Sequence, residues 1–218
     1  MMKLINTIEI APLKYSKEEH DLPESSDYPD SDEWFRKWEE AVSKLNLDFH
    51  AIQKDSYLVD IEAIDDENLQ IILETNLKEI NWEEYEDQII AFDGGIVLKD
   101  DDQVLITPTC CGDIGNIKEW KKILDCKTSD WSEMWIGHPW IFYRKENGKV
   151  QFSDYSDVNL NEFIDIKAIF EIDESELKNE FEKVKQHQIN FKNRISKILQ
   201  KMNIKNVEKI SKLMTGIE

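Results

Sequence analysis

Hydrophobic residues along the chain recur with two spacings, which predict an alternation of strands and helices. Residues 4–10 and 57–63 alternate apolar and polar positions, as half-buried strands do. Intervals of three and four residues predict helices in four further segments, which are residues 31–45, 66–80, 82–90 and 117–124. Asp66 suits the N-cap of the second of these helices, because its side chain can accept from free backbone N–H groups.

Two β-hairpins are predicted around tight turns. Residues 96–98 and 104–106 flank the acidic sequence KDDDQ, whereas residues 140–144 and 149–152 flank a Lys-Glu-Asn-Gly turn. Asn-Gly between alternating apolar runs is typical of a two-residue hairpin connection. Strands that cluster into hairpins, with helices before, between and after them, predict an α+β fold with a mainly antiparallel sheet.

The end of the chain has the most regular helical pattern. Asp173 suits an N-cap, and neither Pro nor Gly interrupts residues 173–202. We therefore predict a body of residues 1–172 and a C-terminal helical segment of residues 173–218. An apolar stripe with one polar member, Gln188, follows the helix at heptad intervals. Its apolar members are Leu177, Phe181, Val184, Phe191, Ile195, Ile198 and Met202.

The charge is unevenly divided between these two parts. The formal net charge of the whole chain is −19. Residues 177–214 nevertheless carry ten Lys and Arg against three Asp and Glu, whereas residues 1–176 carry 17 against 42. We favour a helix docked on its own acidic body, and hence a monomer. A helix-mediated dimer with Gln188 setting the register is the alternative. Nucleic acid is not expected as a partner, because the body repels phosphates.

The sequence also bears on the compartment. No run approaches the roughly 18 apolar residues that a membrane-spanning helix needs, and the N-terminal residues do not resemble a secretory signal. Three cysteines, an odd number, make a poor disulfide framework. We expect reduced thiols, a cytoplasmic location and no membrane partner.

Residues 92–155 contain most of the residues that could carry chemistry. Cys110, Cys111, Cys126 and His138 include the ligand types that zinc prefers. The C-x2-C spacing that preorganises zinc ligands is missing, and adjacent cysteines point apart on an extended backbone. We therefore predict neither a metal nor a cofactor.

A cysteine enzyme is the alternative to a binding protein. Cys110 or Cys111 would be the nucleophile, His138 the base, and Asp113 or Asp154 the group that orients the base. The interpretation that we favour is structural. It makes both cysteines small buried residues at a strand end, and it makes Asp113 the cap of the helix that follows.

Aromatic and acidic residues of this region suggest a protein interface. Trp135 and Trp140 bracket His138, which we expect to be at least half-buried and bonded to a backbone carbonyl. Tryptophan is a favoured interface anchor, so an exposed pair here would mark a partner site. Asp100, Asp101 and Asp102 would attract a cationic partner.

We also expect one shared core for this region, with Cys110 and Cys111 buried beside it. Its predicted members are Phe92, Ile96, Leu98, Leu105, Trp120, Ile136, Ile141 and Phe152.

A set of short motifs occurs in order along the chain: Trp82 and Tyr85 in a helix, the Phe92-Asp93-Gly94-Gly95 turn, a hairpin through residues 96–106, Gly112-Asp113, Trp135-Ile136-Gly137, and the hairpin of residues 140–152. Together these motifs resemble the SUKH superfamily of cell-wall-regulator-like and toxin-immunity domains. Cys110-Cys111 and the long basic helix depart from the family pattern. The resemblance covers about a third of the chain. It implies an α+β fold that acts by binding and transfers no catalytic residues.

These observations favour a non-enzymatic binding module over an enzyme. The most specific hypothesis is an immunity-type inhibitor of a cationic bacterial toxin, with Asp100, Asp101, Asp102, Trp135 and Trp140 in the partner-binding surface. Many nuclease toxins are basic because their substrate is polyanionic, so an acidic inhibitor gains steered association.

Overall fold

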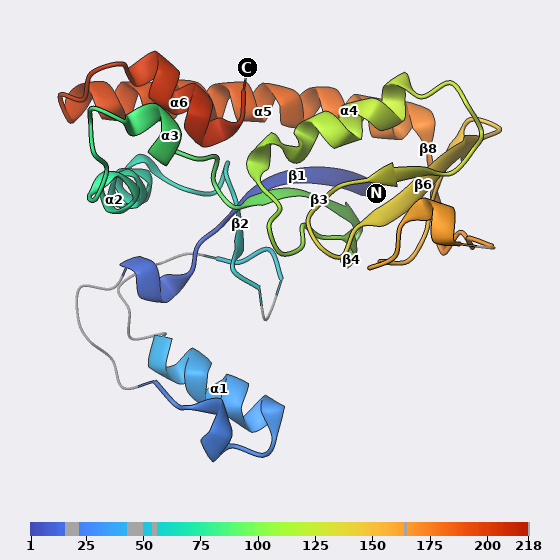
Figure 1. The fold of residues 1–218 in the computed structure, drawn as a ribbon, viewed down its shortest axis with the longest axis horizontal. Coiled ribbons are helices and arrows are strands. Elements are labelled where there is room, and N and C mark those ends of the chain that lie inside the picture. Colours follow the sequence, from blue (N-terminus) through green and yellow to red (C-terminus); the bar gives the residue numbers. More distant parts are fainter. Residues whose placement is uncertain (16–21, 43–49, 54–55, 164, 218) are drawn as a thin grey trace.

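The chain folds into two four-stranded antiparallel sheets with one long helix and shorter helices along one side, in a computed structural model (Figure 1). The structure describes residues 1–15, 22–42, 50–53, 56–163 and 165–217. This arrangement confirms the predicted α+β class.

The first sheet is built around β1, which pairs with β2 on one side and with β3 on the other. Its strands, in spatial order, are β2 (Leu58–Asp60), β1 (Met2–Glu9), β3 (Gly94–Asp100) and β4 (Gln103–Ile106). Gly94, the first residue of β3, occupies a position where the strand lies very close to β1. A Cβ on Gly94 would be 2.5 Å from the carbonyl oxygen of Thr7, and the φ of Gly94 is +132°.

The second sheet is a meander, in which each strand pairs with the next one along the chain. Its strands are β5 (Ser132–Met134), β6 (Ile141–Glu146), β7 (Lys149–Phe152) and β8 (Phe170–Asp173). The β6–β7 hairpin turns at Asn147 and Gly148, which both have positive φ, as the Asn-Gly sequence predicts.

Six α-helices and four short 3-10 helices occur in the described residues. The α-helices are α1 (Ser31–Val42), α2 (Asp66–Leu77), α3 (Tyr85–Gln88), α4 (Ile117–Asp125), α5 (Glu174–Lys201) and α6 (Val207–Thr215). The 3-10 helices are η1 (Pro12–Tyr15), η2 (Ser25–Asp27), η3 (Ile114–Asn116) and η4 (Leu160–Glu162).

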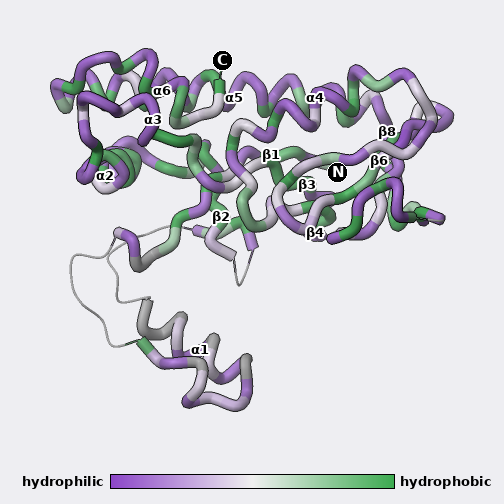
Figure 2. The backbone as a smooth tube through the Cα atoms, viewed as in Figure 1, coloured by the Kyte–Doolittle hydropathy of each residue, from purple (hydrophilic) through white to green (hydrophobic). Residues whose placement is uncertain are grey.

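Helix α5 connects the two hydrophobic cores of the molecule. Leu177, Phe181 and Val184 near its start belong to the core that the second sheet and α4 share. Phe191 and Ile195 farther along belong to a core with α2, α6 and the other end of β1. Hydrophobic and hydrophilic segments alternate along α5 in Figure 2, as expected for a helix with one buried face.

Polar contacts also attach α5 to the rest of the chain. The buried Gln188 amide donates to the carbonyl oxygens of Ile114 at 3.0 Å and Thr215 at 2.7 Å. Arg194 Nε donates to Asp66 Oδ1 at 3.0 Å, and its guanidinium also donates to the carbonyls of Ile61 and Ile64. The polar member of the stripe therefore binds its own chain.

The predicted shared core is correct for most of its members. Ile96, Leu98, Trp120, Ile136, Ile141 and Phe152 are buried in one cluster, against which Leu105 packs. Phe92 is an exception, because it packs in the other cluster and contacts Phe191 with ring centroids 6.2 Å apart. The prediction that Cys110 and Cys111 are buried is wrong, since both are exposed.

Several predicted boundaries shift in the structure. Helix α2 is capped by Asp65, which accepts from the backbone N–H of Asn68, so the prediction of Asp66 as cap is wrong. Asp173 caps α5 as expected. The helix predicted over residues 82–90 is only one turn long, and Leu45 of the first predicted helix lies outside the described residues.

No helix among the described residues combines the length and the apolar character that crossing a membrane requires.

Candidate functional site

The rings of Trp135, His138 and Trp140 form a cluster, here called the aromatic patch, between β5 and β6, in which Trp135 and His138 are exposed and Trp140 is half-buried. The rings of Trp135 and Trp140 are 5.8 Å apart, and the His138 ring lies 5.3 Å from Trp140. Trp135 is 38 % exposed and the His138 side chain is 52 % exposed. The patch therefore offers apolar ring surface to a partner.

Backbone pairing fixes the loop that carries the patch. Met134 pairs with Ile141 at the sheet end of the loop, and Trp140 exchanges two backbone hydrogen bonds with Ser156. Gly137 has a φ of +114°, and a Cβ there would be 2.5 Å from the Cys110 carbonyl oxygen. Glycine is thus required where the loop passes the Cys110 segment.

His138 differs from its predicted environment. It is exposed, and its Nδ1 lies 3.0 Å from Asp157 Oδ1, so the expectation of a half-buried ring bonded to a backbone carbonyl is wrong. It is the backbone N–H of His138, and not the ring, that donates to a backbone carbonyl; the acceptor is Cys110 O, at 2.8 Å. The imidazole lies outside the core because the loop turns its side chain toward the acidic segment after β7.

Further apolar side chains are exposed on the segment that follows β7. They are Tyr155, Val158, Phe163 and Ile169. The Phe163 ring packs edge-on against Phe142 of β6, with centroids 5.2 Å apart. A groove of about 240 Å³ between this segment and the sheet is lined by both phenylalanines and by Ile169. Trp140 joins the patch to this segment through its pairing with Ser156.

The two adjacent cysteines sit in a tight turn beside the patch. Gly112 N–H donates to the Thr109 carbonyl at 3.0 Å, which closes the turn around Cys110 and Cys111. Cys111 has a φ of +67°, a left-handed conformation that is uncommon for residues other than glycine. The assumption of an extended backbone is therefore wrong. The two sulfur atoms point to the same side and lie 3.4 Å apart.

The cysteine-enzyme alternative finds little geometric support. A hydrogen bond to Cys110 and the negative charge of nearby Asp93 hold the pKa of the Cys111 thiol above its ordinary value. Asp113 caps η3 by accepting from Gly115 N–H at 2.6 Å, as predicted, and Asp154 accepts from Tyr155 N–H. Neither carboxylate contacts the His138 imidazole, which pairs with Asp157 instead.

The four proposed metal ligands do not form a cluster. Cys126 lies at the end of α4, where its thiol contacts Thr128. Within the described ranges, no group of three or more His, Cys, Asp or Glu side chains is arranged to hold a metal ion.

The acidic tip of the β3–β4 hairpin is exposed, and two of its carboxylates contact the amino group of Met1. The amino group of Met1 lies 3.2 Å from Asp100 Oδ1 and also contacts Asp101. These contacts raise the pKa of the amino group and lower the pKa of the Asp101 carboxyl. The tip therefore presents less free negative charge than the sequence DDD indicates.

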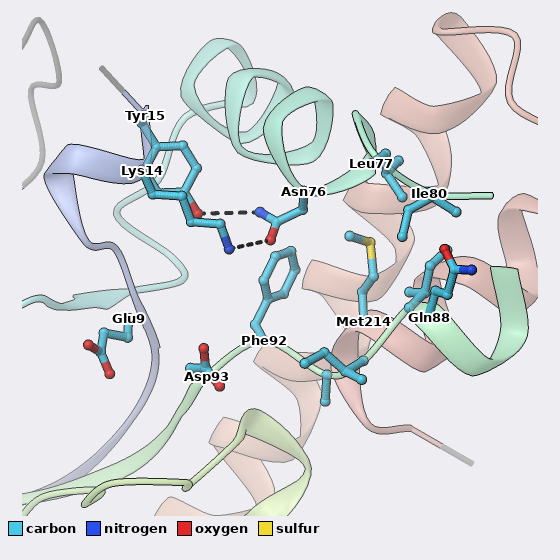
Figure 3. Close-up of a pocket in the computed structure, with 13 residues that line it drawn as sticks. Glu9, Lys14, Tyr15, Asn76, Leu77, Ile80, Gln88, Phe92, Asp93 and Met214 are labelled. Carbon is cyan, nitrogen blue, oxygen red and sulfur yellow. Dashed lines mark hydrogen bonds between the residues drawn. The ribbon is translucent and has the colours of Figure 1, made fainter. Parts of the chain in front are cut away.

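A separate cavity of about 220 Å³ lies where β1 ends beside α2 and α6 (Figure 3). Phe92 and Met214 point into it, and the side chains of Glu9 and Asp93 lie at one edge. Burial and the charge of Asp93 raise the pKa of Glu9. The opposite edge is occupied by a hydrogen-bond network, because Asn76 accepts from Lys14 at 2.9 Å and donates to the Tyr15 hydroxyl at 3.3 Å. This network attaches η1 to α2.

Sequence reasoning missed two features of the site. The Asp157 partner of His138 had no signal, because the two residues are 19 positions apart in the chain. The Cys110–Cys111 turn had a partial signal in the glycine that follows it. The sequence indicated that Trp135 and Trp140 would mark a partner site if both were exposed; the structure exposes Trp135 and leaves Trp140 half-buried.

Comparisons of the chain with protein-family models, with curated proteins and with solved structures found no match to any of them.

Proposed function

We propose that the protein is a non-enzymatic binding module that holds a cationic protein, in the simplest case a basic bacterial toxin, on its aromatic patch. The observation that carries the proposal is the exposure of Trp135 beside Trp140 and His138. Tryptophan dominates the energetics of many interfaces, because its ring buries a large area at a small cost in conformational entropy. A rigid loop, fixed by Gly137 and by pairing with Ser156, would limit that cost further.

Charge around the patch supports a cationic partner. Asp157 is next to His138, and its side chain is 72 % exposed. Asp130, Glu133 and Asp154 are also exposed on the adjoining segments. A net charge of −19 adds a long-range attraction that would accelerate association with a basic protein. The resemblance to SUKH domains supports the same role, because immunity proteins of that superfamily act by binding.

The test begins with the gene next to the one that encodes this chain. If that gene encodes a basic toxin, the two proteins are purified separately and their Kd is measured by calorimetry. Trp135→Ala should weaken binding at least about tenfold, or about 1.4 kcal/mol. A higher salt concentration should slow association, because exposed charges are screened beyond roughly 10 Å.

A matched control comes from the same chain. Trp82 is 45 % exposed and packs beside Tyr85, the first residue of α3, which Figure 1 places toward the opposite end of the molecule from β6. Trp82→Ala should leave Kd within about twofold, as expected for a residue outside the interface. The proposal would be contradicted if Trp135→Ala and Trp82→Ala lost the same affinity for the toxin. It would also be contradicted if the neighbouring gene encoded a metabolic enzyme to which the protein does not bind.

A further inference from the structure

The turn at Cys110 and Cys111 holds two thiols side by side in a fixed arrangement. Thr109 N–H donates to the Ile136 carbonyl at 3.0 Å, and the Thr109 hydroxyl donates to the Pro139 carbonyl at 2.7 Å. His138 N–H donates to Cys110 O at 2.8 Å. These bonds attach the Thr109–Cys110 side of the turn to the segment that precedes β6, and Gly94 N–H donates to the Gly112 carbonyl at 3.0 Å on the other side, so the positions of the sulfurs are preorganised.

Glycines make this close packing possible. A Cβ on Gly112 would be 2.5 Å from the Ile136 carbonyl oxygen, and a Cβ on Gly137 would be 2.5 Å from the Cys110 carbonyl oxygen. The backbone of the turn therefore has little room to shift. The two sulfur atoms, 3.4 Å apart, are exposed rather than packed into the core.

This separation suits an atom that bridges the sulfurs better than a bond between them. A disulfide needs the sulfurs at about 2.05 Å and Cα atoms usually at least about 4.4 Å apart, whereas neighbouring Cα atoms are only about 3.8 Å apart. A tetrahedral ion with bonds of about 2.3 Å spans sulfurs about 3.8 Å apart. Trivalent arsenic is pyramidal, with a narrower S–As–S angle, and so spans a shorter distance.

The number of ligands that the protein supplies narrows the choice of the atom that could bridge the two sulfurs. Among the described residues there is no cluster of three His, Cys, Asp or Glu side chains that could complete a metal site. Cys110 and Cys111 supply two sulfurs 3.4 Å apart, and two thiolates are what a trivalent arsenical with one organic substituent requires. Both cysteines line an open cavity of about 590 Å³, together with Tyr57, Leu58 and Pro108, which would receive an aryl or alkyl substituent.

We propose that Cys110 and Cys111 form a bidentate site for monosubstituted trivalent arsenicals. In the binding step the two thiols react with R–As=O, and two As–S bonds form as two S–H bonds and the As=O bond break. The oxygen leaves as water with both thiol protons. Arsenic remains trivalent, so neither an oxidant nor a reductant is consumed.

Phenylarsine oxide is the probe that tests this site. The full chain is reduced, its three free thiols are counted, and it is incubated with one equivalent of the probe. Intact-mass spectrometry should show one phenylarsine unit, which should persist in excess monothiol and be removed by a competing dithiol such as 2,3-dimercaptopropanol. Thiol titration should then detect Cys126 alone.

Three variants locate the adduct. Cys110→Ser and Cys111→Gly should each lose at least nine-tenths of the monothiol-resistant adduct, and glycine suits the left-handed backbone at position 111. Cys126→Ser should retain the adduct fully. Circular dichroism confirms that each variant is folded. The proposal is wrong if the reduced wild-type chain retains no adduct, or if loss of a turn cysteine leaves retention unchanged.

Discussion

Replacement of Gln188 by leucine should destabilise the protein strongly, although leucine has a similar volume and suits a buried helix face. Gln188 is 2 % exposed, and its amide satisfies carbonyl oxygens of two other segments, at Ile114 and Thr215. Loss of the amide leaves two buried acceptors without this donor, and an unsatisfied group costs about 1–3 kcal/mol. The additional apolar burial of leucine offsets part of that cost. We expect a net loss of about 2–4 kcal/mol.

Urea denaturation measures the change in the free energy of unfolding, and a thermal melt measures the matching change in Tm. For a chain of this size the loss corresponds to a fall in Tm of about 4–16 °C. The slope of the unfolding free energy against urea should stay constant, because the surface exposed on unfolding is nearly unchanged. Gln186→Leu is the matched control, since Gln186 is exposed on the same helix and should change stability by less than about 0.5 kcal/mol.

Gln188→Glu adds a pH-dependent version of the same test. A carboxylate at this position would face two carbonyl oxygens in a buried site, so its folded pKa should be raised above the ordinary value of about 4.3. A raised pKa makes the folded state less stable as the pH rises from about 4 to about 7. If Gln188→Leu were neutral, or if Gln188→Glu were insensitive to pH, the assigned role of this amide would be refuted.

Three further predictions concern the core, the first sheet and the cap of α5. Trp120→Ala should lower the free energy of unfolding by about 3–5 kcal/mol. Trp120→Phe should lower it clearly less, because this change keeps an aromatic ring and removes a buried Nε1–H that lacks a hydrogen-bond partner in the structure. Equal losses of stability for the two variants in thermal melts would contradict this account. Gly94→Ala should lower the free energy of unfolding by about 1–3 kcal/mol or more, because Gly94 has a φ of +132° and the added Cβ would collide with Thr7. An unchanged Tm would show that β1 and β3 can move apart without an energetic penalty. Hydrogen bonds from Ser175 and Glu176 lower the pKa of the Asp173 carboxyl. Wild type should therefore lose stability relative to Asp173→Asn as the pH falls below about 3.9. Parallel curves of unfolding free energy against pH for the two proteins would exclude a stabilising role of the Asp173 carboxylate.

The features that the sequence predicts well are those specified by long regular patterns. Residues 173–202 repeat their apolar positions over many turns, and α5 occupies residues 174–201. The two predicted hairpins likewise appear as β3–β4 and β6–β7. In each case local periodicity and burial require the same structure.

Short elements escaped prediction because their stability comes from neighbours. Strand β5 has three residues and β8 has four, and each exists through pairing with an adjacent strand. Helix α6 has nine residues and is stabilised by packing on α5. Isolated segments of such length have too few internal contacts to specify a structure by themselves.

The candidate site was predictable in composition but not in geometry. Trp135 and Trp140 are neighbours, with Trp135 exposed and Trp140 half-buried. The proximity of the thiols depends on the positive φ of Cys111, and cysteine is not a residue that signals such a conformation. The His138–Asp157 pair depends on how the segment after β7 returns to Trp140, a tertiary property.

The position of α5 has a consequence for synthesis on the ribosome. Residues of this helix contribute to both hydrophobic cores, yet they follow every strand of the two sheets that the described residues form. A nascent chain that has emerged only as far as β8 would still expose the faces that Phe181 and Phe191 cover. Neither core can therefore close until α5 has left the exit tunnel. Until then the faces that α5 covers stay open, and exposed apolar surface in an incompletely folded chain favours aggregation, which chaperones counteract.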